Sequence, residues 1–189
     1  MIKGKHMSDT ALILVDIQND YFELGKWPVA QMQTVADNAA RLLAQSRGRG
    51  DLVVHIRHEI PSDAALFFSA GSPGAEINPT AAPVGDEAVI VKARPNSFVG
   101  TDLLARLQGA GIQAVTICGA MSQMCIDATT RAAVDHGFQV SVAQDACGAK
   151  EMTFGDVSLT AAQVHAAFMA PLAMSYAQVV TTEALLSAG

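Results

Sequence analysis

The chain has 189 residues, of which 50% are hydrophobic, 5% aromatic and 16% charged. A chain of this length forms one domain whose core is large enough to fold without disulfide bonds. Its formal net charge is −6, from 12 basic and 18 acidic residues, so nucleic acid is not an expected partner. No apolar run approaches the roughly 20 residues that a membrane-spanning helix needs, and no membrane association is expected.

Residues 1–9 are expected to form an N-terminal tail, and residues 10–189 a single domain. Cys118, Cys125 and Cys147 are an odd number of cysteines and include no CxxC pair. This argues against a disulfide scaffold or a cysteine zinc site and favours a reducing compartment. We therefore expect a cytoplasmic protein.

Short apolar runs recur along the chain and predict the strands of one sheet. The predicted strands are residues 11–17, 52–56, 88–91, 114–118 and 139–142, with a weaker sixth at 178–181. Most of these runs lack polar alternation, so both faces of the sheet are expected to be covered, which is typical of parallel strands. The predicted fold class is α/β, a three-layer α/β/α (Rossmann-like) arrangement with a mostly parallel sheet of about six strands.

Amphipathic helices are predicted between the apolar runs. The first begins near residue 32 and stops at Gly50. In the second, Thr101 is the expected N-cap and Gly109 the expected end. A third is predicted over residues 123–134. The last contains Pro171, which is expected to kink it.

Residues 59–85 break this rhythm, since they show no convincing periodicity and hold four of the seven prolines. A connection of this length inside a compact domain is usually functional, so we predict a lid or pocket wall. Phe67 and Phe68 favour a wall, because adjacent exposed aromatic side chains would be costly. The alternative is an excursion over the surface.

Reactive side chains follow three of the predicted strands. Asp16 comes at the end of the first, Lys92 directly after the third and Cys125 shortly after the fourth. Ligands of open α/β sheets bind beyond the carboxyl ends of the strands. We therefore expect a carboxylate, an ammonium and a thiol to meet at one edge of the sheet.

This trio of side chains suits nucleophilic catalysis. Cys125 is expected in the first turn of a helix, where the helix dipole and Lys92 would lower the pKa of its thiol. Asp16, in a buried strand, needs a cation, and Lys92 can supply it. Taken singly, the residues also have structural explanations, because a cysteine often packs in a core and an aspartate often caps a turn.

Three stretches around these residues carry a more specific pattern. They read Val-Asp-Ile-Gln-Asn-Asp-Tyr-Phe (15–22), Lys-Ala-Arg-Pro-Asn-Ser-Phe (92–98) and Gly-Ala-Met-Ser-Gln-Met-Cys-Ile-Asp-Ala-Thr-Thr-Arg-Ala-Ala (119–133). In order and spacing they resemble the signatures of the isochorismatase-like cysteine hydrolases, over essentially the whole chain from about residue 10. This family includes nicotinamidases, N-carbamoylsarcosine and ureidoacrylate amidohydrolases, and isochorismatases.

The resemblance implies a catalytic triad of Asp16, Lys92 and Cys125. The sulfur would attack an amide carbonyl, ammonia or an amine would leave, and water would hydrolyse the thioester. It also implies a cis peptide bond between Ala120 and Met121. The backbone N–H of Met121, with that of Cys125, would then form an oxyanion hole.

The candidate substrate-binding residues are Gln18, Tyr21, Phe67 and Phe68. Tyr21 stands where the resembled family often places an aromatic side chain against the substrate. The sequence does not identify the substrate, because specificity in such sites lies in the loop walls rather than in the triad.

No metal and no cofactor are expected. Nicotinamidases carry an Asp-x-His pair after the second strand, where a metal binds, and here the sequence reads His55-Ile56-Arg57-His58-Glu59 instead. His55 and His58 would point to opposite faces of a continuing strand, so one metal would not easily bind both, and structural roles are predicted for them.

The predicted function is a cysteine hydrolase that cleaves a small-molecule carbon–nitrogen bond of the amide or ureido type. Isochorismatases proper generally lack the nucleophilic cysteine, so Cys125 favours this over ether cleavage. The alternatives are an isochorismatase-type ether hydrolase and a catalytically retired or redox-responsive relative that binds a metabolite. The resemblance also implies a homo-oligomer, dimer or tetramer, to which the last apolar helix could contribute a contact face.

Overall fold

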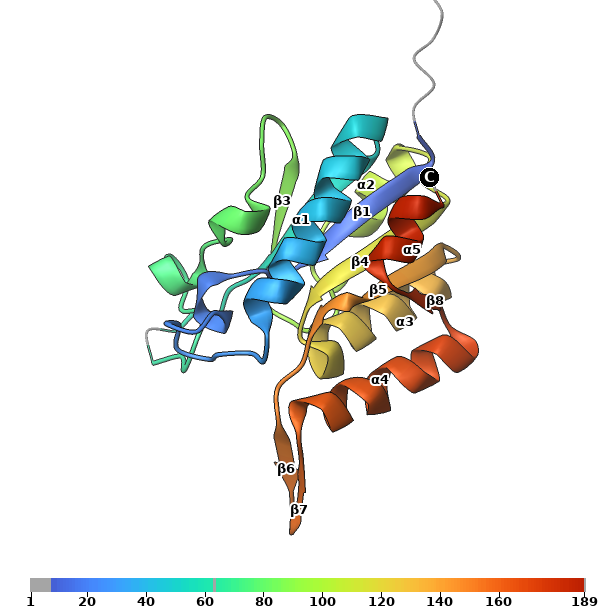
Figure 1. Ribbon diagram of the computed structural model, residues 1–189. Coiled ribbons are helices and arrows are strands. Elements are labelled where there is room, and N and C mark those ends of the chain that lie inside the picture. Colours follow the sequence, from blue (N-terminus) through green and yellow to red (C-terminus); the bar gives the residue numbers. More distant parts are fainter. Residues whose placement is uncertain (1–7, 63, 189) are drawn as a thin grey trace, which may run out of the picture.

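The computed structural model describes residues 8–62 and 64–188 (Figure 1). Most of the predicted tail, residues 1–9, lies outside the described residues. Asp9 is already attached to the domain, because its carbonyl accepts the backbone N–H groups of Gln113 and Ala114 at 2.8 and 3.2 Å.

The central sheet has six strands in the order β3-β2-β1-β4-β5-β8, and each neighbouring pair is parallel. The strands are β1 (Thr10–Val15), β2 (Leu52–His58), β3 (Ala88–Lys92), β4 (Ala114–Ala120), β5 (Gln139–Gly148) and β8 (Gln178–Val180). The predicted parallel sheet is confirmed. β1 ends at Val15 rather than at Ile17, because Asp16 takes a left-handed backbone conformation with φ of 52°.

Helices cover both faces of this sheet (Figure 1). α1 (Met32–Arg49) and α5 (Thr182–Ser187) lie on one face, and α2 (Leu103–Gly109), α3 (Asp127–Asp135) and α4 (Ala161–Ser175) on the other. Alternate residues of β1 face the two layers, since Leu12 and Leu14 pack with α1 while Ile13 and Val15 belong to the opposite core. The three-layer α/β/α fold is therefore confirmed.

Two helix starts differ from the prediction, those of α2 and of α3, which begins at Asp127 rather than near residue 123 because Ser122–Ile126 form a π-helical turn. Gly50, with φ of 75°, caps the C-terminus of α1 as predicted. At α2 the N-cap is Asp102, whose carbonyl accepts the N–H of Arg106 at 3.0 Å. Thr101, the predicted N-cap, lies one residue earlier, and its hydroxyl donates to the Ser97 carbonyl at 2.6 Å while accepting the Leu103 N–H at 3.4 Å.

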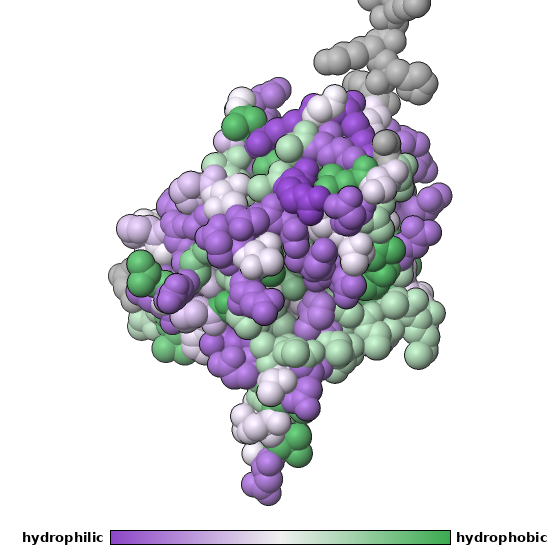
Figure 2. Space-filling view, viewed as in Figure 1, coloured by the Kyte–Doolittle hydropathy of each residue, from purple (hydrophilic) through white to green (hydrophobic). Residues whose placement is uncertain are grey.

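A small hairpin, β6 (Met152–Phe154) and β7 (Val157–Leu159), projects from the domain (Figure 1). No strand was predicted here, since three-residue strands are too short to show periodicity. All six residues are exposed, and Phe154 is 91% exposed. Figure 2 shows a pale green surface along the neighbouring α4, whose outward residues are largely alanine. The homo-oligomer stays a prediction.

No helix within the described residues is both long and apolar enough to cross a bilayer.

Candidate active site

Asp16, Lys92 and Cys125 meet at the carboxyl edge of the sheet. Asp16 follows β1, Lys92 ends β3, and Cys125 lies in a π-helical turn, η4 (Ser122–Ile126), between β4 and α3. The Lys92 Nζ lies 2.8 Å from Asp16 Oδ2 and 3.3 Å from Cys125 Sγ. All three residues are buried, with at most 4% of each exposed. The structure thus brings together the three side chains that the sequence singles out.

The close approach of β4 to β1 shapes the Asp16 side of the site. Gly119 has φ of 124°, and a Cβ at this position would collide with the carbonyl of Val15. Only glycine fits there, directly beside the residue that precedes Asp16. Asp16 itself is held in its left-handed conformation by a hydrogen bond of 3.0 Å from its N–H to the Ile56 carbonyl. Such backbone outliers concentrate at functional sites.

The π-helical turn presents Cys125 on the other side. Met121 is central to this turn, because its carbonyl accepts the N–H groups of Met124 at 3.0 Å and Ile126 at 3.2 Å. The Ala120–Met121 peptide bond is cis, at the position for which the family resemblance implies it. π-Helical turns of this kind often occur at functional sites.

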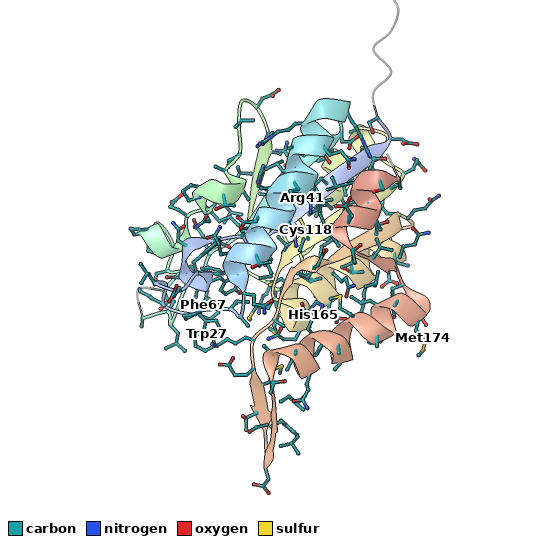
Figure 3. The ribbon with its side chains drawn as sticks, viewed as in Figure 1. Trp27, Arg41, Phe67, Cys118, His165 and Met174 are labelled. Atoms are coloured by element: carbon teal, nitrogen blue, oxygen red, sulfur yellow. The ribbon has the colours of Figure 1, made fainter. Side chains whose placement is uncertain are left out.

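Ser122 fixes the same turn to two neighbouring elements. Its hydroxyl lies 3.1 Å from the Gly148 carbonyl at the end of β5 and 2.9 Å from His165 Nδ1 on α4. Figure 3 labels His165 near the start of α4. Ser122 is fully buried, so these contacts satisfy its hydroxyl and restrain the loop that carries the thiol.

The Cys125 thiol is not the low-pKa group that was predicted. Burial, and after it the negative charge of Asp16, raise the pKa of Cys125 far above its ordinary value, and Lys92 offsets only part of this effect. The prediction was wrong because it weighed the cation and the helix dipole without the loss of solvent. The thiol is therefore protonated at neutral pH. The redox-responsive alternative depends on an exposed thiol of low pKa, and Cys125 is neither exposed nor of low pKa.

Asp16 lies beside the thiol, with one carboxylate oxygen within 4.8 Å of Cys125 Sγ. Its Oδ2 accepts from Lys92, whereas Oδ1 is buried and has no hydrogen-bond partner within the described part of the chain. Burial alone would lower the pKa of Lys92, but the charge of Asp16 and the hydrogen bonds to Asp16 and Cys125 outweigh it and raise that pKa. The site thus combines an ammonium, a neutral thiol and a carboxylate with one vacant acceptor atom.

His58 is a fourth member that the sequence analysis missed. It ends β2, which runs two residues beyond its predicted end, and its Nδ1 lies 2.9 Å from Lys92 Nζ. The structural role predicted for it is therefore incomplete. The signal that could have identified it is strand order, because β2 lies between β1 and β3 and its last residue must reach the same edge. His55 fits its prediction, since it is buried on β2 and its Nε2 lies 3.0 Å from a carboxylate oxygen of Glu87.

Asp16, His58 and Cys125 also form a cluster of metal-ligand types. One atom from each lies within 4.8 Å of the other two. The Lys92 ammonium is within hydrogen-bond distance of all three residues. In the described structure these three side chains therefore surround the charged side chain of a lysine. That no metal takes part stays a prediction.

Gln18 was predicted to bind substrate, but its side chain instead supports the backbone of the site. It is fully buried, and its side-chain amide bonds the backbone of His58 through both N–H and carbonyl, at 2.8 and 2.9 Å. Its Nε2 also donates to the Ala75 carbonyl at 2.7 Å. Both ends of this amide are thus used within the protein.

Four aromatic side chains form a wall beside the site, which we call the aromatic wall. Its members are Tyr21, Trp27, Phe67 and Phe68. Phe68 lies 4.5 Å from Tyr21 and 5.0 Å from Phe67 between ring centroids, and Phe67 stacks on Trp27 at 4.9 Å (Figure 3). Phe68 also lies 6.2 Å from the His58 ring, so the wall leads to the triad.

Phe67 and Phe68, from the predicted wall segment, supply half of this wall, and Phe68 is attached to the domain. The backbone N–H of Phe68 donates to the buried carboxylate of Asp20 at 2.7 Å, and Phe68 is fully buried. A surface excursion would not bury an aromatic side chain in this way, so the predicted pocket wall describes the segment better. A cavity of about 1070 Å³ lies between residues 19–33 and 72–78, and none of the triad residues lines it.

Comparison with known proteins agrees with this geometry. The isochorismatase domain family matches residues 10–184. The chain is 46% identical to the isochorismatase family protein YddQ of Bacillus subtilis, whose activity is uncharacterised, over 94% of this chain and 98% of YddQ. It is 31% identical to a maleamate amidohydrolase of Pseudomonas putida, over 73% of this chain and 71% of that protein. A crystal structure from Oleispira antarctica, assigned to the isochorismatase hydrolases, superposes with a TM-score of 0.93 at 45% identity, covering 97% of this chain and 100% of that one.

Proposed function

The chain belongs to the isochorismatase family of hydrolases, and from this premise we propose that it cleaves a carbon–nitrogen bond in a small amide or ureido substrate through a thioester on Cys125. The contact of one ammonium with a carboxylate and a thiol, at 2.8 and 3.3 Å, is the observation that carries the proposal. A related maleamate amidohydrolase, itself an enzyme of amide chemistry, supports the choice of bond.

The first step is attack by sulfur. Because the thiol is neutral, the proton moves from Cys125 Sγ to Asp16 Oδ1 as the sulfur–carbon bond forms. The carbonyl π electrons move to oxygen, where the N–H groups of Met121 and Cys125 are proposed to stabilise the oxyanion. Lys92 stays protonated and keeps its hydrogen bonds to the Asp16 carboxyl and the sulfur.

In the second step the oxyanion collapses and the carbon–nitrogen bond breaks. Asp16 returns its proton to the departing nitrogen, so that ammonia or an amine leaves and a thioester remains on Cys125. Asp16, again a carboxylate, then takes a proton from water as the water oxygen attacks the thioester. The sulfur departs as a thiolate and recovers that proton from Asp16, which restores the starting state.

The test is ammonia release from a panel of small amides and ureido compounds, including maleamate, with Cys125→Ala as the matched blank. We expect the wild type to release ammonia from at least one member and Cys125→Ala to release none above background. Equal release from both proteins would contradict the proposal. Pyruvate release from isochorismate would favour ether cleavage, and a folded wild type inert towards every compound would favour the catalytically retired relative.

A further inference from the structure

The Lys92 ammonium has as many hydrogen-bond acceptors as it has protons. Its Nζ lies 2.8 Å from Asp16 Oδ2, 2.9 Å from His58 Nδ1 and 3.3 Å from Cys125 Sγ. An ammonium donates three hydrogen bonds and accepts none. Since Lys92 stays charged, His58 Nδ1 must be an acceptor, and the proton of the neutral imidazole is on Nε2.

His58 is held in place by groups other than Lys92. The side-chain amide of Gln18 bonds both the N–H and the carbonyl of the His58 backbone. Phe68 of the aromatic wall lies 6.2 Å from the imidazole between ring centroids. The imidazole is thus a restrained acceptor, whereas the lysine side chain reaches the site on four flexible bonds.

We propose that His58 is a positioning residue for the reaction. Its neutral imidazole accepts one N–H of Lys92 and so directs the other two towards Asp16 and Cys125, and the site works only while His58 is uncharged. This rests on the function proposed above. A protonated His58 would have no free acceptor at Nδ1 and would place a second cation against the ammonium, which would turn Lys92 away from the sulfur.

The charged and titratable groups that face His58 come from three elements. Lys92 lies at the end of β3, Asp16 after β1 and Cys125 in η4. Burial has the largest effect on the pKa of His58, and together with the positive charge of Lys92 it lowers this pKa below its ordinary value of 6.5. The negative charge of Asp16 acts in the opposite direction and offsets only part of the shift. His58 is therefore neutral at pH 7, and as pH falls through its pKa the imidazole gains a proton and activity should fall.

Two substitutions separate the acceptor from the titration. His58→Asn keeps an acceptor oxygen where Nδ1 was but does not titrate, and His58→Leu removes the acceptor at similar size. With an amide that the wild type hydrolyses, His58→Asn should keep kcat within about tenfold and lose the acid limb that His58 imposes on kcat/KM. His58→Leu should lose about a hundredfold in kcat with little change in KM, as expected for a misplaced catalytic group. Wild-type kcat and pH profile in His58→Leu, or equal losses in both variants, would overturn the inference.

A second measurement needs no substrate and keeps the inference separate from the proposed function. Nitrogen-15 NMR of the histidines reports which ring nitrogen carries the proton, and the His58 signal is the one of five absent from His58→Asn. At pH 7 we expect His58 neutral with its proton on Nε2, and titrating below 6.5. A proton on Nδ1 at pH 7 would overturn the contact even if amides are hydrolysed. If no amide is hydrolysed but the tautomer is as expected, the proposed function fails, and with it the role of His58 in that reaction, while the contact between His58 and Lys92 stands.

Discussion

Replacement of Asp16 by asparagine is expected to lower kcat for amide hydrolysis by about 10²- to 10⁴-fold, the usual contribution of a general base. The reason is the protonation state of the nucleophile. Because burial and the Asp16 charge raise the pKa of Cys125, the thiol needs a base in the same step as its attack, and an asparagine amide cannot take the proton. Steady-state kinetics at saturating substrate measure the change, with circular dichroism to show that the variant is folded.

Asp145→Asn is the matched control for this substitution. Asp145 accepts hydrogen bonds from the backbone N–H and hydroxyl of Thr182, at 2.6 and 2.8 Å, at the start of α5. An asparagine oxygen can accept the same bonds, so this variant should keep wild-type kcat. If Asp16→Asn retains more than a tenth of the wild-type kcat, Asp16 is not the base and the proposed proton route is wrong.

Replacement of Lys92 by methionine is expected to remove activity and to lower the free energy of unfolding by about 3–5 kcal/mol. The Lys92–Asp16 pair is fully buried, so methionine leaves the Asp16 carboxylate in a low dielectric without its cation. The double variant Asp16→Asn with Lys92→Met has no such unpaired charge. It should therefore be less destabilised than the sum of the two single variants, as measured by urea unfolding at pH 7.

An exposed ion pair provides the comparison. Arg41 and Glu183 lie 2.7 Å apart, but their side chains are 50% and 71% exposed. Arg41→Met should therefore cost at most about 1 kcal/mol. Strictly additive losses in the Lys92 and Asp16 variants would show that the buried pair is not coupled, and would contradict the description of the triad as one charged unit.

The sequence predicted the sheet and the triad because both follow from strong, local patterns. Aliphatic runs without polar alternation indicate strands that are covered on both faces, and parallel strands bring their carboxyl ends to one edge. Asp16, Lys92 and Cys125 each stand close after such a run, so their meeting needs no knowledge of loop structure.

The features that sequence reasoning missed depend on three-dimensional context. His58 joins the site only because β2 lies between β1 and β3 and extends to its last polar residue. The pKa of Cys125 depends on how completely the surrounding core excludes water, which the order of residues does not reveal. Gln18 stands in a motif beside Asp16, but the direction of its side chain is set by the backbone groups that it bonds.

The central claim is that a sulfur atom, held by one carboxylate and one ammonium, forms the covalent intermediate. Acid quenching during turnover, followed by mass spectrometry of the peptide that carries Cys125, tests this directly. We expect a mass increase equal to the acyl part of the substrate on that peptide in the wild type, and no increase on any peptide of Cys125→Ala. Undiminished amide hydrolysis by Cys125→Ala, or an acyl group trapped on another residue, would contradict it.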